Sequence, residues 1–295
     1  MKKTLIAASI AAFVAAPAAF AEVSIYGKAH LAAEFYNSAA DEDQIDSRAS
    51  RFGIKASEDL GNGLSAFVKY EFGADAIDGN NGLTARDAFM GLKGDFGTLT
   101  VGRMAAPTKA VLYGTGNVQL ADANKGFDFA SNYASKGTRV NNAIAYGTKV
   151  GGVNVTLATV GDDNDDNFAD QAIGLSTDLG SVHVGFAHIN DDGDENLTIA
   201  GAKMSMDALT LGVVYEDHDE NSDTLGASAS YKMGSNVVSV SMSSRDFDGA
   251  DDLDVTTVGL EHKLSKKTSA YLSYASVDDG ADEDSVTSVG MIMNF

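Results

Sequence analysis

Segments of about ten residues in which apolar and small polar side chains alternate recur along most of this chain. In the stretch 209–215, leucine, valine and tyrosine occupy the odd positions, and the same period appears in 225–233, 238–243 and 270–274. Successive side chains of a β-strand point to opposite faces, so the pattern predicts strands rather than helices. About ten residues is also the length that a tilted strand needs to cross the hydrocarbon layer of a membrane.

Short and long connections alternate between these segments. The short links include DLGNG, GDFG and KVGG, and the longer, acidic links include DEDQID, GDDNDDN and NDDGDEN. Short turns at one rim and long polar loops at the other are typical of outer-membrane barrels. The sequence therefore predicts an all-β, 16-stranded antiparallel transmembrane β-barrel between Val23 and Phe295, with short periplasmic turns and long acidic extracellular loops. Fourteen or eighteen strands remain alternatives, because the signal of each strand is weak.

The first residues predict export. Lys2 and Lys3 precede an apolar run over 5–16, and Ala19, Phe20 and Ala21 form a small-x-small cleavage site. This is the pattern of a signal peptide over residues 1–21, and its apolar run is shorter than the roughly 20 residues of a membrane-spanning helix. We therefore expect cleavage after Ala21 and a barrel domain over residues 22–295.

Composition narrows the function. The chain has no cysteine, and after residue 21 its only proline is Pro107. Such a chain has no disulfides, and nearly every backbone amide is available for a strand ladder. Removal of Lys2 and Lys3 from the 21 basic side chains leaves 19 against 42 acidic ones, a formal charge of about −23. This charge argues against nucleic acid as a partner.

A soluble β-sandwich would also show alternation, with its polar face in water. Two features favour the membrane barrel. The polar positions are repeatedly serine, glycine, threonine and lysine, as a water-filled lumen requires, and aromatic residues such as Tyr26, Tyr146 and Tyr215 lie near strand ends, as in an interfacial girdle. Alternation continues through residues 285–295. In a closed barrel the last strand pairs with the first, so Phe295 is expected in the wall, facing lipid at the rim.

Three blocks carry a family resemblance. SRFGIKASEDLGNGLSAFVKYEF (50–72), RDAFMGLKGDFGTLTVGR (86–103) and RVNNAIAYGTK (139–149), together with the terminal Phe295, resemble the trimeric general diffusion porins of Gram-negative outer membranes. The resemblance implies a homotrimer surrounded by outer-membrane lipid and lipopolysaccharide. It also implies that Phe295 is the signal read by the outer-membrane assembly machinery, and that small hydrophilic solutes and ions diffuse passively through the barrel.

The resemblance further implies that the third long loop folds inward and opposes its carboxylates to a basic wall. The matching loop is 104–135, and its acids are Asp122 and Asp128. Inward positions are expected for the basic residues because a charge at the lipid midplane costs about 2–4 kcal/mol. The predicted basic wall comprises Arg51, Lys55, Lys69, Arg86 and Arg139. A structural alternative is that these side chains only pair with loop carboxylates and hold the loop in place.

The acidic loops predict cation selectivity that weakens as salt screens their charge. GDDNDDN and NDDGDEN do not follow the spacing of a helical calcium loop, so we predict no metal site and no cofactor.

Three alternatives to a general pore remain. The five histidines are scattered and neither H-E-x-x-H nor G-x-S-x-G occurs, so an enzyme requires His188 or His262 beside a serine or aspartate on the outer wall. A substrate-selective channel requires lumenal aromatics, for which only Phe67 and Tyr271 qualify by alternation. A non-conducting adhesin or structural barrel needs no opposed charges. The prediction is therefore a channel and not an enzyme.

Overall fold

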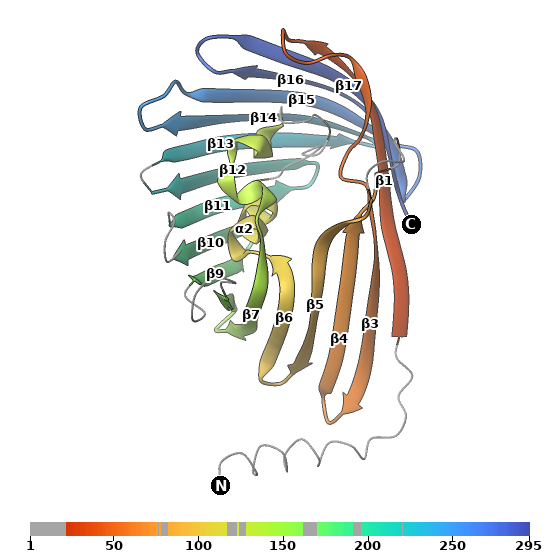
Figure 1. Ribbon diagram of the computed structural model, residues 1–295, viewed down its shortest axis with the longest axis vertical. Helices are drawn as coiled ribbons and strands as arrows, with labels where there is room; N and C mark the ends of the chain where they lie inside the picture. Colours follow the sequence, from red (N-terminus) through yellow and green to blue (C-terminus); the bar gives the residue numbers. More distant parts are fainter. Residues whose placement is uncertain are drawn as a thin grey trace.

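The computed structural model describes residues 22–75, 77, 82–116, 123, 128–161, 170–190, 196–219 and 221–295. Within them, one antiparallel sheet of 17 strand segments curves around until its first and last strands pair (Figure 1). The strands are β1 (Glu22–Asn37), β2 (Gln44–Ser47), β3 (Arg51–Gly61), β4 (Leu64–Gly73), β5 (Thr84–Gly94), β6 (Gly97–Ala105), β7 (Arg139–Val150), β8 (Val153–Val160), β9 (Asp170–Leu179), β10 (Val182–Asn190), β11 (Leu197–Met206), β12 (Leu209–His218), β13 (Ser222–Met233), β14 (Asn236–Phe247), β15 (Leu253–Lys263), β16 (Thr268–Asp278) and β17 (Glu283–Asn294).

Two of these segments form a single barrel strand. β2 pairs with residues 31–34 of β1, and β3 pairs with residues 22–28 of the same strand. Between them, Ala49 has a φ of 47°, which interrupts the extended backbone for three residues. The 17 segments therefore make 16 barrel strands. The predicted strand number is confirmed, and the alternatives of fourteen and eighteen are wrong.

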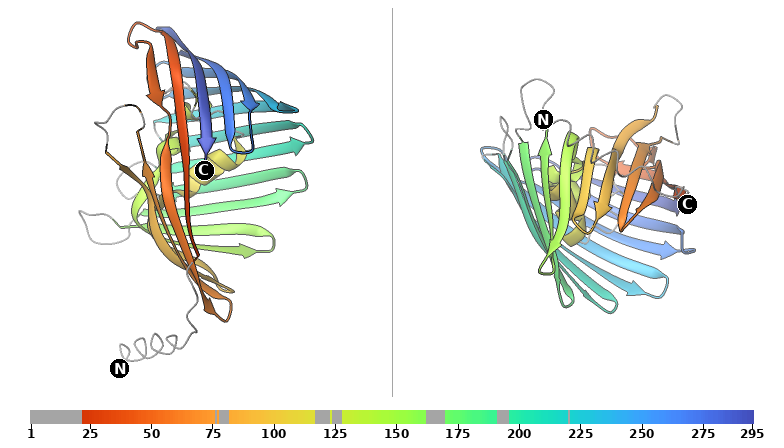
Figure 2. Two further views of the ribbon diagram at one scale, coloured as in Figure 1. Left: turned by 90° about the vertical axis from the view of Figure 1, so that its right-hand side faces the viewer. Right: turned by 90° about the horizontal axis from the view of Figure 1, so that it is seen from below.

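The barrel closes through β1. Gly27 and Phe295 exchange two backbone hydrogen bonds of 3.1 Å, and β1 lies between β17 and β3 (Figure 2, left). The Phe295 ring covers Gly27, where an added Cβ would lie 2.1 Å from it. A closed sheet has no second sheet to pack against, so the sandwich alternative is wrong.

Burial along the strands is the reverse of that in a soluble domain. On β14, Val238, Val240 and Met242 are 38 %, 42 % and 59 % exposed. The serines between them, at 239, 241 and 243, are 8 %, 9 % and 4 % exposed. Apolar side chains therefore cover the outside and small polar side chains face the lumen, which is the arrangement of a barrel surrounded by lipid.

The two rims differ in the length of their connections. At one rim, two-residue turns such as 62–63, 95–96 and 151–152 join neighbouring strands. At the other rim lie longer connections, which include 38–43, 74–83 and 248–252. The longest connection with described residues is segment 106–138, between β6 and β7. It differs from the predicted 104–135 because β6 continues through Ala105 and β7 begins only at Arg139.

Within the described ranges, the helical elements lie in segment 106–138. They are α2 (Pro107–Thr115) and the short 3₁₀ helices η1 (Phe129–Asn132) and η2 (Ala134–Gly137). Proline suits the first turn of α2, because the amide that it lacks would have no partner there. α2 lies on the concave side of the sheet, beside β10 and β11 (Figure 1). Among the residues that the structure describes, no helix has the length and hydropathy needed to cross a bilayer.

A buried apolar cluster joins segment 106–138 to the inner wall. From the segment it takes Val111, Leu112, Phe129 and Tyr133. From β10, β11 and β12 it takes Ala187, Ile199 and Val214. The main apolar core of the molecule therefore lies inside the barrel, between this segment and one side of the wall.

Candidate functional site: the charged side of the lumen

The predicted basic residues of β3, β4, β5 and β7 gather around two carboxylates. Lys69 Nζ lies 2.5 Å from Asp87 Oδ2 and 3.4 Å from Glu71 Oε2. Arg86 Nε lies 2.7 Å from Glu71 Oε1, and Arg139 Nε lies 2.6 Å from Asp87 Oδ1. These bonds join three strands, and Arg51 on β3 adds a fourth. We name the six residues Arg51, Lys69, Glu71, Arg86, Asp87 and Arg139 the wall cluster.

The remaining contacts of the wall cluster involve Arg51 and Tyr26. Arg51 Nε is 4.0 Å from Glu71 Oε1, the longest of the ion pairs. The Tyr26 hydroxyl donates a hydrogen bond of 2.8 Å to Glu71 Oε2. Glu71 is only 6 % exposed, so its carboxylate is held almost entirely by these donors.

A β-bulge explains how adjacent residues of β5 join the same cluster. Tyr70 pairs with Ala88, and Phe72 pairs with Ala85, so Arg86 and Asp87 together stand opposite Glu71. A bulge re-aims the side chains of the longer strand, which alternation alone would send to opposite faces. Both Arg86 and Asp87 therefore bond to lumenal partners.

Glu71 and Asp87 were missed by sequence reasoning. Glu71 could have been found, because it lies two residues after Lys69 on β4 and so shares its face. Asp87 could also have been found, because it shares its parity with Phe89 on the face opposite the exposed Met90. Only the inward place of Arg86 depends on the bulge, which no residue type signals. The structural alternative was that the basic residues only pair with carboxylates of the loop. Among the described residues, their ion-pair partners are Glu71 and Asp87, which lie on the wall itself.

Lys55 completes the predicted basic wall but pairs differently. Its Nζ lies 4.5 Å from the centroid of the Tyr26 ring, a cation–π contact, and it forms no ion pair with a carboxylate among the described residues. Five basic residues thus face two carboxylates on this side of the lumen, which leaves a formal surplus of three positive charges.

The predicted acids of the loop do not oppose this charge in the described structure. Asp122 lies outside the described residues. Asp128 is 2 % exposed, caps η1 by accepting a 3.0 Å bond from the Ala130 amide, and accepts a 2.7 Å bond from Lys136. Contrary to the prediction, the Asp128 carboxylate is used inside segment 106–138 and is not presented to the lumen.

Hydrogen bonds fix segment 106–138 to the side of the wall remote from β3–β5. Asn132 Nδ2 donates to the carbonyl oxygens of Ser243 and Leu253, at 2.9 and 2.8 Å. The buried Glu216 carboxylate accepts from the backbone amides of residues 134 and 135, at 2.6 and 3.2 Å. The helices of the segment thereby cover β9–β15, Ala123 contacts Tyr271 on β16, and the described part of the segment leaves the wall cluster on the other side.

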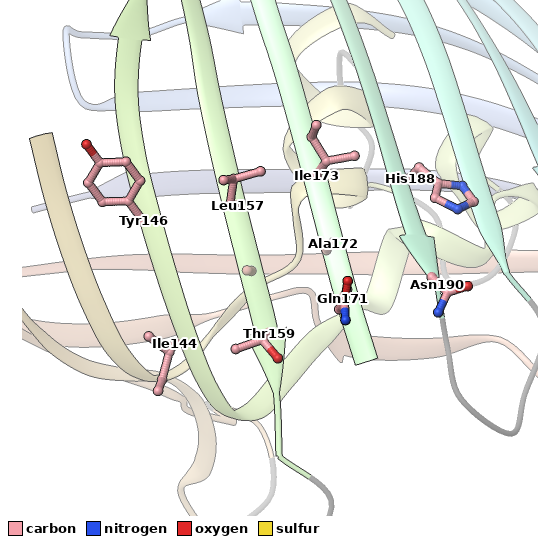
Figure 3. A pocket seen from close by; sticks show the side chains of 10 residues that line it. Ile144, Tyr146, Leu157, Thr159, Gln171, Ala172, Ile173, His188 and Asn190 are labelled. Carbon is pink, nitrogen blue, oxygen red and sulfur yellow. The ribbon is translucent and has the colours of Figure 1, made fainter. Parts of the chain in front are cut away.

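A separate groove of about 540 Å³ lies on the outside of the barrel (Figure 3). Its lining includes Ile173 on β9 and His188 on β10. Their chain neighbours Gly174 and Ala187 face segment 106–138, so Ile173 and His188 point the other way, toward lipid. This groove takes no part in the lumenal site.

Among the described residues, neither His188 nor His262 has the partner that the enzyme alternative requires. His188 Nδ1 lies 2.8 Å from Thr198 Oγ1, and His262 Nδ1 lies 2.8 Å from Asn236 Oδ1. The enzyme alternative required a serine or aspartate partner for one of them. In the part of the chain that the structure describes, no three histidine or acidic side chains are placed to hold a metal ion. The loops GDDNDDN and NDDGDEN lie largely outside that part.

A closed antiparallel barrel with an apolar exterior and a charged lumen defines the class of membrane-spanning β-barrels. The family model described as Gram-negative porin matches residues 7–282, so this chain belongs to the Gram-negative porin family. The family resemblance of the sequence is thereby confirmed. Membership places the chain in the Gram-negative outer membrane.

Curated relatives match only part of the chain. The major outer membrane protein P.IB of Neisseria gonorrhoeae is 38% identical over 119 residues, which are 37% of this chain and 34% of the relative. The P.IB protein of Neisseria lactamica is 35% identical over 136 residues, 42% of this chain and 39% of the relative. The chain thus spans little more than a third of the length of these relatives.

Solved structures match nearly all of the fold. The anion-selective porin from Comamonas acidovorans superposes with a TM-score of 0.75 at 22% identity, covering 94% of this chain and 100% of that one. OmpTdeltaL8, a loop-deletion mutant of an outer membrane protein of Vibrio cholerae, gives 0.72 at 17% identity, covering 93% and 99%. At these identities the likeness establishes the fold alone.

Proposed function

We propose that this chain forms a water-filled pore through which small hydrophilic solutes and ions diffuse passively across the outer membrane. The observation that carries the proposal is the wall cluster: four basic side chains from four strands, exposed by 12–28 % and held by two carboxylates inside a closed barrel. A packed structural core would bury such charges fully or omit them, whereas a wet passage can use them.

In this proposal, segment 106–138 is the constriction loop and the wall cluster with Lys55 is the basic side of the constriction. The segment is rigid where it is bonded to β12, β14 and β15, which supports a fixed rather than a mobile narrowing. A polar solute exchanges part of its hydration for contacts with the charged side chains, while an apolar solute must disrupt ordered water.

We propose cation selectivity at low salt, caused by the acidic loops at the rim that segment 106–138 shares. The chain has 42 acidic against 21 basic residues, and acidic side chains make up half or more of connections such as 38–43 and 248–252. These charges concentrate cations at the mouth within about 10 Å at 0.1 M salt.

Assembly and export complete the proposal. Residues 1–21 act as a signal peptide cleaved after Ala21, and Phe295 is the signal for the outer-membrane assembly machinery. The barrel associates as a homotrimer within outer-membrane lipid and lipopolysaccharide. The support for the role of Phe295 is its place in the wall, where its backbone bonds to Gly27 and its ring is 51 % exposed.

The deciding experiment is the conductance of the purified protein in a planar lipid bilayer, with the reversal potential under a salt gradient. Stepwise openings in groups of three, with a cation-selective reversal potential at 0.1 M salt, are expected. Protein that inserts without conducting would exclude the pore and favour a non-conducting adhesin or structural barrel. A substrate-selective channel would instead show low ion conductance that one solute class blocks at micromolar concentration.

A further inference from the structure

A recess of about 460 Å³ opens into the lumen between the wall cluster and the short-turn rim. Its lining combines cationic, aromatic and hydroxyl groups from β1, β3, β4 and β5. These groups include Glu22, Ser24, Lys55, Ser57, Phe67 and Phe89. We propose, on the basis of the proposed pore function, that this recess binds small monocarboxylates that carry an apolar ring, with benzoate as the simplest probe.

The cationic part of the recess is Lys55. The other basic residues of this wall have carboxylate partners within 4.0 Å, whereas among the described residues the Lys55 ammonium group has a cation–π contact with the Tyr26 ring and no ion pair. Its side chain is exposed to the lumen. An ammonium group without a counterion can accept a solute carboxylate without first breaking an ion pair.

The apolar part of the recess is an aromatic pair. The Phe67 and Phe89 rings lie edge to face, with their centroids 6.3 Å apart. Phe67 occupies space left by Gly91, where an added Cβ would lie 2.5 Å from the ring. Lys69 pairs with Lys55 on β3 and with Phe89 on β5, and Phe67 lies two residues before Lys69 on the same face of β4. Both rings therefore share the lumenal face with the ammonium group of Lys55. An apolar ring of a solute can therefore pack on phenylalanine while its carboxylate reaches Lys55.

Hydroxyl groups and one acid complete the site. Ser24 stands opposite Lys55, and Ser57 follows two residues later on the same face of β3. Both hydroxyls can donate to a carboxylate. Glu22 stands opposite Ser57 at the edge of the recess, and its negative charge opposes anion binding. Neutralising Lys55 should therefore weaken the binding of a carboxylate, and neutralising Glu22 should strengthen it.

The test measures the block by benzoate of the ionic current through the purified porin in potassium chloride, with acetate at the same ionic strength as the ringless control. Benzoate is expected to block at least several-fold more strongly than acetate. Lys55→Gln should weaken the benzoate block by about tenfold, the factor that corresponds to 1.4 kcal/mol. Phe67→Leu should reduce the difference between benzoate and acetate, and Glu22→Gln should strengthen the block.

Lys149→Gln is the matched control. It removes a lysine near the short-turn rim of β7, on a strand that does not line the recess. Benzoate block should remain at the level of the unmodified protein. Equal block by benzoate and acetate, or an equal loss in Lys55→Gln and Lys149→Gln, would overturn the proposed recess while leaving the pore intact.

Binding in detergent separates this proposal from the pore itself. Saturation-transfer NMR of benzoate with the purified, folded protein should show contact that Lys55→Gln removes. A protein that is silent in bilayers but retains this contact would refute passive transport and preserve the recess. A conducting protein without benzoate contact would refute the recess and leave passive transport in place.

Discussion

The two sides of the lumen carry different side chains. β3, β4 and β5 present long charged residues, whereas β9–β15 present mainly glycine, alanine, serine and threonine. The first side is left uncovered by the described part of segment 106–138, and the second side is where the segment packs. In the proposed pore, narrowing and solute contact therefore fall on opposite walls. Small residues on one wall admit the segment, and large charged residues on the other face the remaining space.

Glycines of the covered wall make the closest approach to segment 106–138. A Cβ at Gly212 would lie 2.7 Å from the Thr115 oxygen and from the backbone carbon of Gly116. A Cβ at Gly226 would lie 2.2 Å from the Tyr133 hydroxyl. At Gly212 the obstacle is backbone, which cannot rotate away as a side chain can, so this position tests the covered wall most directly.

Gly212→Leu alters the covered wall and should have the largest effect. The added side chain must displace the end of α2, and overpacking of this kind costs about 1–3 kcal/mol or more. We expect a lower unfolding temperature in detergent, measured by circular dichroism. Single-channel conductance should become larger and noisier, because segment 106–138 no longer lies against its wall.

Gly147→Leu is the control for that change. Gly147 has nothing within 4 Å of an added Cβ, so the same side chain enters open space. Its unfolding temperature should stay close to that of the unmodified protein. If Gly212→Leu and Gly147→Leu have the same unfolding temperature and conductance, the position of segment 106–138 against the wall does not depend on a glycine at 212.

Glu71→Gln alters the uncovered wall and should have the next largest effect. It removes a carboxylate that contacts Arg51, Lys69, Arg86 and Arg139, and it raises the local surplus of positive charge by one. Hydrogen bonds to charged groups contribute about 1.5–3 kcal/mol each, so stability should fall within that range. The reversal potential should shift toward anions.

Glu58→Gln provides the charge-matched comparison for Glu71→Gln. Glu58 is exposed near the short-turn end of β3 and makes no ion pair among the described residues. The reversal potential of the Glu58→Gln variant should differ little from that of the unmodified protein. A shift equal to that of Glu71→Gln would mean that the wall cluster does not control ion passage.

The fold was predictable because lipid and a water-filled lumen impose a strict period on every strand. The alternation at 238–243 gave the correct faces for β14, and the strand count survived even where Ala49 splits one strand into β2 and β3. The charged site was predictable only in part. Four of the five basic residues follow from parity and from the cost of charge in lipid, and Arg86 follows from that cost alone.

What alternation missed depends on local geometry. The bulge at Arg86 and Asp87 breaks parity, and the capping role of Asp128 depends on where η1 begins. In sequence, Asp128 resembles any loop acid, and only its bonds to Ala130 and Lys136 show that its charge is satisfied locally. Irregular backbone has no period, so a pattern of residue types cannot place its side chains.

Salt should separate the contributions of the mouth and the uncovered wall. The screening length falls from about 10 Å at 0.1 M to about 3 Å at 1 M, so distant loop charges lose their influence first. Charges that ions touch in the lumen remain effective. Cation preference at 0.1 M should therefore give way to a weak anion preference at 1 M, measured as a change in sign of the reversal potential. A cation preference that is equal at both concentrations would contradict this assignment.

The smallest expected effect is a graded loss of cation preference on acidification at low salt. The negative charge of Asp246 is the main cause that raises the pKa of exposed Asp252 in connection 248–252. The backbone amides of Asp282 and Ala281 donate to Asp279 at 2.8 and 3.1 Å and lower its pKa. As pH falls, Asp252 therefore becomes neutral before Asp279 does.

Asp252→Asn tests the order of these steps. At neutral pH it should lower the cation preference slightly, and on acidification the first part of the loss should be missing. Asp279→Asn should leave that first part in place and remove a part at lower pH, because the Asp279 carboxylate keeps its charge to lower pH than Asp252 does. The measurement is the reversal potential at 0.1 M salt as a function of pH. Identical pH profiles for the two variants would show that only the total charge of the loop acids matters. The order in which Asp252 and Asp279 titrate would then have no effect on ion selectivity.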